Sequence, residues 1–181
     1  LLSVVANITV DQPSQVERLR GTFTFTITIT DCPPNLTFGV VNFQVTGTAN
    51  PNCDYQASGF LTCGYITFYG NGSQSATVTI ENDPWREEDE TITVRLTGGW
   101  WTDTSCCGAY PVTIGENSAA TVTIFDDDQW NFYLTAVDDI GAETLQGENN
   151  ATFRITRSNL REPDLSYGIK VYYDISGTAT Q

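Results

Sequence analysis

Acidic side chains gather in a few short stretches of this 181-residue chain. The segment 82–90 carries five carboxylates, and the run Asp126–Asp128 carries three more. Asp54 and Glu17 each stand beside a stretch of alternating apolar and polar residues. Carboxylate oxygens suit hard cations, and calcium takes 6–8 of them at roughly 2.3–2.6 Å. If these acids meet in the fold, the sequence predicts a site for one or two calcium ions; otherwise they form a solvated, solubilising face.

Composition removes several classes of function. There are 22 acidic and 8 basic residues, a net charge of -14, so neither nucleic acid nor an anionic membrane surface is an expected partner. The absence of histidine removes the commonest general base and transition-metal ligand. Paired carboxylates can hydrolyse glycosides, but a cluster of acids suits a cation better, so we expect no enzyme. Apolar runs fall short of the roughly 20 residues of a membrane span, so we expect no insertion.

The elements that must position the acids are strands. Residues 22–30 alternate threonine with phenylalanine or isoleucine, and the same period of two appears at 41–45, 76–80, 91–96 and 120–125. This period predicts half-buried strands. We therefore expect an all-β chain built as an immunoglobulin-like antiparallel sandwich of about seven strands. In such a sandwich the acidic segments fall in connections at one end.

An internal repeat sets the expected domain organisation. The stretch 43–49 recurs in similar form at 173–179, and 22–26 recurs at 152–156, with the same offset. Residues 1–128 are thus expected to form one full unit, and 129–181 the first three strands of a second. A half-sandwich leaves an open edge, so further chain or a neighbouring subunit is expected to complete it.

Separated motifs in the right order resemble those of the Calx-beta domain family. In chain order they are Gly47-Thr48-Ala49, Cys53-Asp54-Tyr55, Thr77 to Asp83, Glu87 to Thr91 and Ala120 to Asp128. The resemblance implies a seven-stranded sandwich that binds calcium at one tip. Carried over by position, it implies these calcium ligands: Glu17, Asp54, Asp83, Glu87, Glu90, Asp126, Asp127 and Asp128. Asn82 stands where the family usually has the first of two aspartates, and its amide supplies oxygen without charge.

Cysteines and glycosylation sequons favour an oxidising compartment. We expect a Cys53–Cys63 disulfide and a second between Cys32 and either Cys106 or Cys107, with one thiol left over. A zinc site is disfavoured because no CxxC spacing occurs. Four sequons are candidates for glycans, at Asn7, Asn35, Asn71 and Asn150. Together these features predict a secreted or cell-surface protein.

Three functional hypotheses follow. The first is an extracellular structural or adhesive module in a tandem array or filament, stabilised by calcium at about 10⁻⁴–10⁻³ M affinity and partnered by other copies or adjacent repeats. The second is a carbohydrate-binding module that stacks glycans on Trp100 and Trp101. The third is a calcium-sensing regulatory domain, which free thiols would favour.

Overall fold

A computed structural model describes residues 3–103, 108–129, 131–139, 142–144, 147–149, 151–157 and 170–177. The chain divides into two compact units, Leu1–Asp128 and Gln129–Gln181. Within the described residues, no helix has the length and apolar character needed to cross a membrane.

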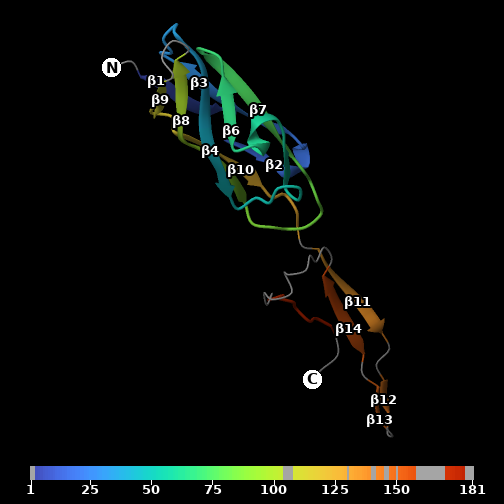
Figure 1. Ribbon diagram of the computed structural model, residues 1–181. Helices are drawn as coiled ribbons and strands as arrows, with labels where there is room; N and C mark the ends of the chain where they lie inside the picture. The colour runs from blue at the N-terminus through green and yellow to red at the C-terminus, as the bar shows by residue number, and fades with distance from the viewer. Residues whose placement is uncertain are drawn as a thin grey trace. The chain divides into compact units, whose positions relative to one another are not determined.

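The first unit is built almost entirely from strands, as the alternating sequence predicts (Figure 1). Its elements are β1 (Val4–Val10), β2 (Ser14–Val16), η1 (Glu17–Leu19), β3 (Thr22–Thr30), β4 (Leu36–Gly47), β5 (Tyr55–Ala57), η2 (Gly59–Thr62), β6 (Tyr65–Phe68), β7 (Gly72–Ile80), β8 (Glu90–Asp103), β9 (Ala109–Ile114) and β10 (Ala119–Phe125). The two η elements are single turns of 3₁₀ helix.

These strands form two layers. One layer runs β1-β3-β7-β5 with antiparallel pairing. The other holds β10, β8, β4 and β6, also antiparallel, with β2 added in parallel beside β10. Strand β9 joins the layers, because Ala109–Pro111 pairs with β8 and Val112–Ile114 pairs in parallel with β1. The expected all-β sandwich is confirmed.

The core lies between the two layers. Phe23, Phe25, Ile27 and Ile29 of β3 point inward and are at most 1% exposed, while the threonines between them face outward. Side chains of β4, β8 and β10 meet them from the other layer. Each such side chain contributes about 1.5–3 kcal/mol by leaving water. The threonine–apolar alternation therefore orients the strand as well as forming it.

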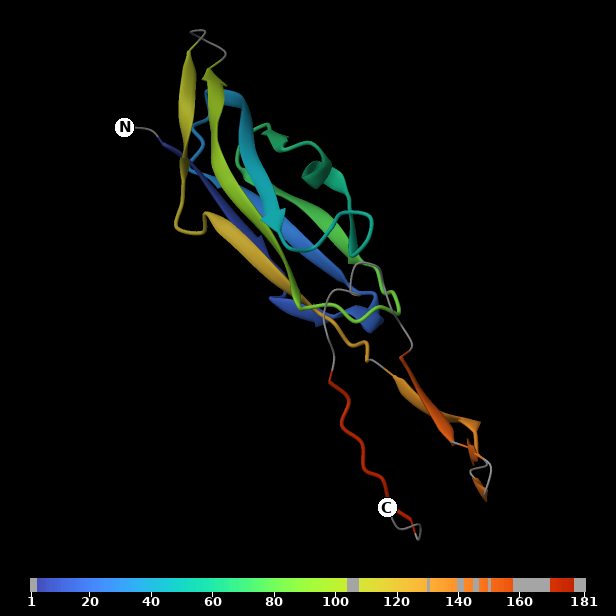
Figure 2. The same cartoon turned by 90° about the horizontal axis from the view of Figure 1, so that it is seen from below.

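One end of the sandwich collects the connections that carry acids. These connections are η1 between β2 and β3, the loop 48–54 after β4, the loop 81–89 between β7 and β8, and the residues after β10. Figure 2 shows η1, the β7–β8 loop and the exit of β10 together at this end. Each of the four connections follows the C-terminal end of a strand, namely β2, β4, β7 or β10. These four strand ends lie at the same end of the sandwich.

The second unit contains two short antiparallel pairs among its described residues. Strand β11 (Phe132–Asp138) pairs with β14 (Thr152–Arg157), and β12 (Ala142–Thr144) pairs with β13 (Gly147–Asn149). Large apolar side chains stay exposed on the first pair, including Leu134 at 68% and Phe153 at 64%. Completion of this unit as a second repeat stays a prediction.

The structure does not contain the expected Cys53–Cys63 disulfide, and this pairing stays a prediction. Both are free, exposed thiols, and Cys32 is a free, buried thiol. The Cys32 sulfur lies 3.5 Å from the carbonyl oxygen of Leu36 as a hydrogen-bond donor. The expected partners of Cys32, Cys106 and Cys107, lie outside the described residues.

Candidate metal centre

Glu17 enters the acidic end from η1. The chain leaves β2, makes one 3₁₀ turn and reverses at Arg20, whose φ of 45° lies in the left-handed region. This turn buries Glu17 to 8% exposure, and its Oε1 accepts a 3.2 Å hydrogen bond from the backbone N–H of Asp83. One carboxylate thereby ties the β2–β3 connection to the β7–β8 loop.

Two groups of three carboxylates lie at this end. Glu17 joins Asp126 and Asp128 from the exit of β10, and one oxygen of each lies within 4.8 Å of the others. Asp54 joins Glu87 and Glu90 under the same limit. We call these groups the first and second carboxylate triads. Each brings together residues from connections that are distant in sequence.

The triads adjoin one another. A small pocket at this end is lined by Glu17 and Asp126 of the first triad, by all three members of the second, and by Glu88 and Ile124. The oxygens that line it come from four connections. Calcium binds such a set of oxygens, because it accepts carboxylates from irregular directions.

The second triad contains an acid with a raised pKa. Burial, followed by a hydrogen bond with Asp54 and the charges of Asp54, Glu87 and Glu17, together raise the pKa of Glu90 to about 8. Asp54 also accepts a hydrogen bond from the backbone N–H of Asn50, which fixes its carboxylate. A proton on Glu90 and a bound cation would both reduce the electrostatic repulsion between these buried carboxylates.

The acids of the first triad also have raised pKa values. Burial and the charges of Asp83, Asp128 and Asp126, against the lowering effect of the Asp83 backbone N–H, together raise the pKa of Glu17 to about 7. Burial likewise raises the pKa of Asp126 and of Asp128. Backbone N–H groups of Asp128 and Glu87 and the charge of Arg86 hold the pKa of Asp126 down in part.

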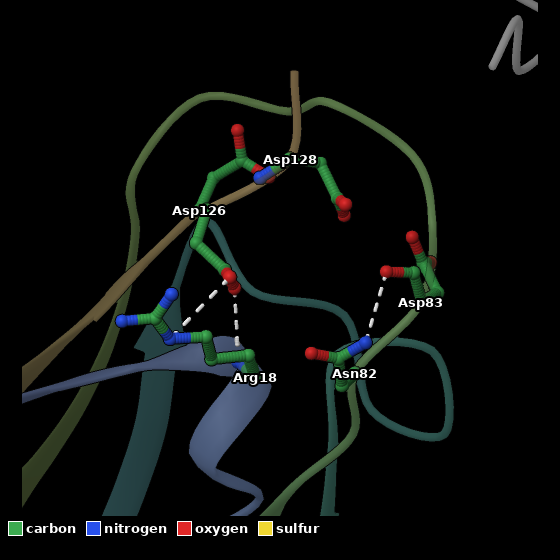
Figure 3. Close-up of polar contacts among 6 residues, drawn as sticks. Arg18, Asn82, Asp83, Asp126 and Asp128 are labelled. Carbon is green, nitrogen blue, oxygen red and sulfur yellow. Dashed lines mark hydrogen bonds and ion pairs between the residues drawn. The ribbon is translucent and has the colours of Figure 1, made fainter.

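Two of the expected ligands belong to neither triad. Asp83 accepts a 2.7 Å hydrogen bond from the Trp85 N–H. Asp127 accepts a 2.9 Å hydrogen bond from the Arg18 N–H and pairs with its guanidinium at 3.8 Å. In Figure 3, Arg18 lies beside the Asp126–Asp128 segment, and Asn82 and Asp83 approach that segment from the other side. The other six expected ligands, Glu17, Asp54, Glu87, Glu90, Asp126 and Asp128, make up the two triads.

Sequence reasoning missed three charged residues at this end. Glu88 lines the pocket, Arg86 lies near Asp126, and Arg18 binds Asp127. Each arginine is next to a glutamate in the sequence, Arg18 after Glu17 and Arg86 before Glu87. This is the only sequence feature that could have indicated a role at the site. It does not distinguish an arginine that pairs with the acids from one that points into solvent.

The structure also tests the predicted sugar-binding tryptophans. Trp101 is fully buried and cannot stack on a sugar, which corrects the paired-tryptophan hypothesis. Trp100 is 39% exposed and meets Phe38 edge-on, with ring centroids 5.6 Å apart. The indole Nε1 of Trp101 has no hydrogen-bond partner among the described residues.

The sequon asparagines of the described residues have partners of their own. The Asn35 amide donates to Asp103 at 3.0 Å, and the Asn71 amide exchanges hydrogen bonds with the backbone of Cys32. Asn7 accepts from the Asn117 N–H at 3.1 Å. Asn150 lies outside the described residues. Glycosylation at these positions stays a prediction.

No family model matches the chain, and no curated protein matches it. Solved structures of similar shape include the calcium binding domain CBD12 of CALX1.1, at 21% identity and a TM-score of 0.45, covering 67% of this chain and 45% of that one. CBD12 from CALX1.2 matches at 20% identity and 0.42, covering 75% and 52%. The Calx CBD2 domain matches at 13% identity and 0.48, covering 66% and 85%. This chain spans about half the length of the first two.

Proposed function

We propose that residues 1–128 form a calcium-binding module in which the ion joins the connections at one end of the sandwich. The observation that carries this proposal is the pair of carboxylate triads, assembled from η1, the loop after β4, the β7–β8 loop and the exit of β10. Without a cation, burial raises the pKa values of Glu17 and Glu90, and repulsion by the neighbouring carboxylates adds to the rise. Calcium would cancel that repulsion and stiffen the end.

Calorimetric titration and thermal melting test this proposal. Calcium should raise the melting temperature, and the free energy of unfolding should increase by about 1.4 kcal/mol when free calcium is ten times the Kd. Glu17→Gln and Glu90→Gln should each weaken the response, one for each triad. Glu116→Gln is the matched control, because Glu116 is an exposed acid outside both triads. A melting curve unmoved by about 10 mM calcium would rule out the proposal at the affinity of weak modules.

We propose further that the module responds to calcium as a regulatory domain. Free thiols at Cys53 and Cys63 support this role over that of a disulfide-bonded extracellular module. The Asn35 and Asn71 amides also have partners that require no glycan. Mass spectrometry of protein from its native cells, after alkylation of free thiols, distinguishes the two roles. The regulatory role requires alkylated Cys53 and Cys63 and no glycan mass.

The extracellular structural module is the second candidate. Four sequons in the chain and the exposed apolar side chains of β11 and β14 favour it. In that case calcium would stiffen a tandem array, and the partners would be other copies of the chain or adjacent repeats. Glycan mass at Asn7 or Asn150, together with oxidised cysteines, would select this role and exclude the regulatory one.

A further inference from the structure

A cavity of about 340 Å³ opens at the edge of the sandwich where β4 and β5 belong to different layers. Val45 and Ile92 line it from one layer, and Tyr55, Ala57 and Val78 line it from the other. Leu61 of η2 also lines it. The cavity is separate from the acidic pocket, since the two share no lining residue.

The size and lining of this cavity match those of a ligand site. Small-molecule pockets occupy about 300–1,000 Å³ and are mostly apolar with a few polar groups. An engineered cavity of only about 150 Å³ binds benzene. The described residues that line the cavity include no charged side chain, and Asn52 and Thr62 supply polar groups at its wall.

Contacts in and around the cavity fix the segments that form its walls. The Phe60 ring of η2 packs on Phe43 of β4, with ring centroids 5.4 Å apart and an angle of 72° (Figure 2 shows η2 beside β4). The Ser58 N–H donates to the Thr77 carbonyl at 2.9 Å, which fixes the chain before η2 to β7. On the other wall the Asn52 N–H donates to the Tyr55 carbonyl at 2.8 Å. The site is therefore largely formed before a ligand arrives.

Electrostatics select the kind of ligand. Tyr55 lines the cavity and follows Asp54 of the second triad, so a carboxylate lies next to one wall. Among the described residues that line the cavity, no lysine or arginine is present to offset the charge of an anion.

We propose that this cavity binds a small, uncharged, mainly apolar molecule. The uncharged class follows from the uncharged side chains that line the cavity, and the apolar class follows from Val45, Ile92 and Leu61. The cavity and the triads share no described residue, so each can be tested by variants that leave the other unchanged.

The test compares two fluorescent probes with the same ring skeleton on the full chain in EDTA. The neutral probe is N-phenyl-1-naphthylamine, and its anionic counterpart is 8-anilino-1-naphthalenesulfonate. The neutral probe should bind saturably at one site per chain, and the sulfonate should bind at least about tenfold more weakly. Absence of saturable binding by the neutral probe, or equal binding of both probes, would overturn the proposal.

Two variants locate the site, and one serves as their control. Ala57→Phe and Val45→Phe fill the cavity and should each reduce probe affinity at least about tenfold. Gln56→Phe adds the same ring to the exposed face of β5 and should leave affinity within about twofold. Circular dichroism and melting identify the folded variants, and either filled variant suffices if the other does not fold. Wild-type affinity in a folded filled variant would place the probe elsewhere and exclude this cavity.

Discussion

At the scale of single residues, the raised pKa values of Glu90 and Glu17 link the acidic end of the sandwich to pH. Glu90 has a pKa of about 8 and Glu17 a pKa of about 7, so both triads are partly protonated near neutral pH. A metal ion and these protons compete for the same oxygens. Calcium binding should therefore release protons and strengthen as pH rises from 6 to 9.

The same groups predict how the stability of the metal-free protein depends on pH. In the folded state Glu17 and Glu90 keep their protons up to about pH 7 and 8, whereas in the unfolded chain they lose them near the ordinary value of 4.5. The folded state thus binds more protons between these limits, and the free energy of unfolding falls as pH rises. Their contribution is complete below about pH 4.5 and is lost as pH passes through 7 and 8.

Urea unfolding in EDTA at pH 5 and pH 8 measures this effect. The midpoint should be lower at pH 8, and Glu90→Gln should reduce the difference because glutamine does not titrate. Glu116→Gln should leave the difference unchanged. A midpoint that rises between pH 5 and pH 8 would contradict the assignment of protons to the triads.

Thiol accessibility is a second property set by single residues. Cys53 and Cys63 are exposed, whereas Cys32 is 9% exposed and burial raises the pKa of its thiol. In a variant with Cys106→Ser and Cys107→Ser, a disulfide exchange reagent should react quickly with two thiols and slowly with the third. Adding urea should make the third react as fast as the others. A single thiol that reacts slowly, with none that reacts quickly and no further thiol released by urea, would instead indicate the Cys53–Cys63 disulfide.

At the scale of elements, the pairing of β4 with β8 depends on a glycine. Gly39 faces Trp101 across the two strands, and a Cβ at position 39 would lie 2.1 Å from the indole ring. Trp101 is fully buried, so its ring has little room to move. The Trp101 ring therefore occupies the space that a side chain at position 39 would need.

Gly39→Ala should therefore destabilise the sandwich by about 1–3 kcal/mol through overpacking. Equilibrium unfolding in urea measures the change. Gln44→Ala in the same strand is the control, because Gln44 is exposed and its loss should change stability by less than about 0.5 kcal/mol. Equal stability of Gly39→Ala and the wild type would show that the indole can shift.

At the scale of the whole molecule, the first unit contains both the hydrophobic core cluster and the two carboxylate triads. Every buried apolar residue of the core cluster lies between Val4 and Ile124, and both triads lie within residues 1–128. Strands β11 and β14 of the second unit expose most of their side chains instead. The free energy of burial therefore resides in the first unit.

A protein of residues 1–128 should accordingly unfold cooperatively and keep its response to calcium. Thermal melting of this fragment and of the full chain, with and without calcium, makes the comparison. The calcium-induced shift should agree between the two within a few degrees. Loss of cooperative unfolding in the fragment would show that the second unit contributes to the core or to the site.

The alternation of Thr22–Thr30 determined a strand, its buried face and the class of the fold by itself, because successive side chains of a strand point to opposite faces whatever it pairs with. The position of the acids in the connections between strands could likewise be predicted from the sequence alone. Which oxygens meet was decided by tertiary structure: Asp126 and Asp128 turn into a triad, whereas Asp127 between them turns to Arg18. Side-chain direction in a connection depends on contacts from distant segments. The same reason explains the free Cys53 and Cys63 and the cavity beside η2, since both depend on how two layers pack.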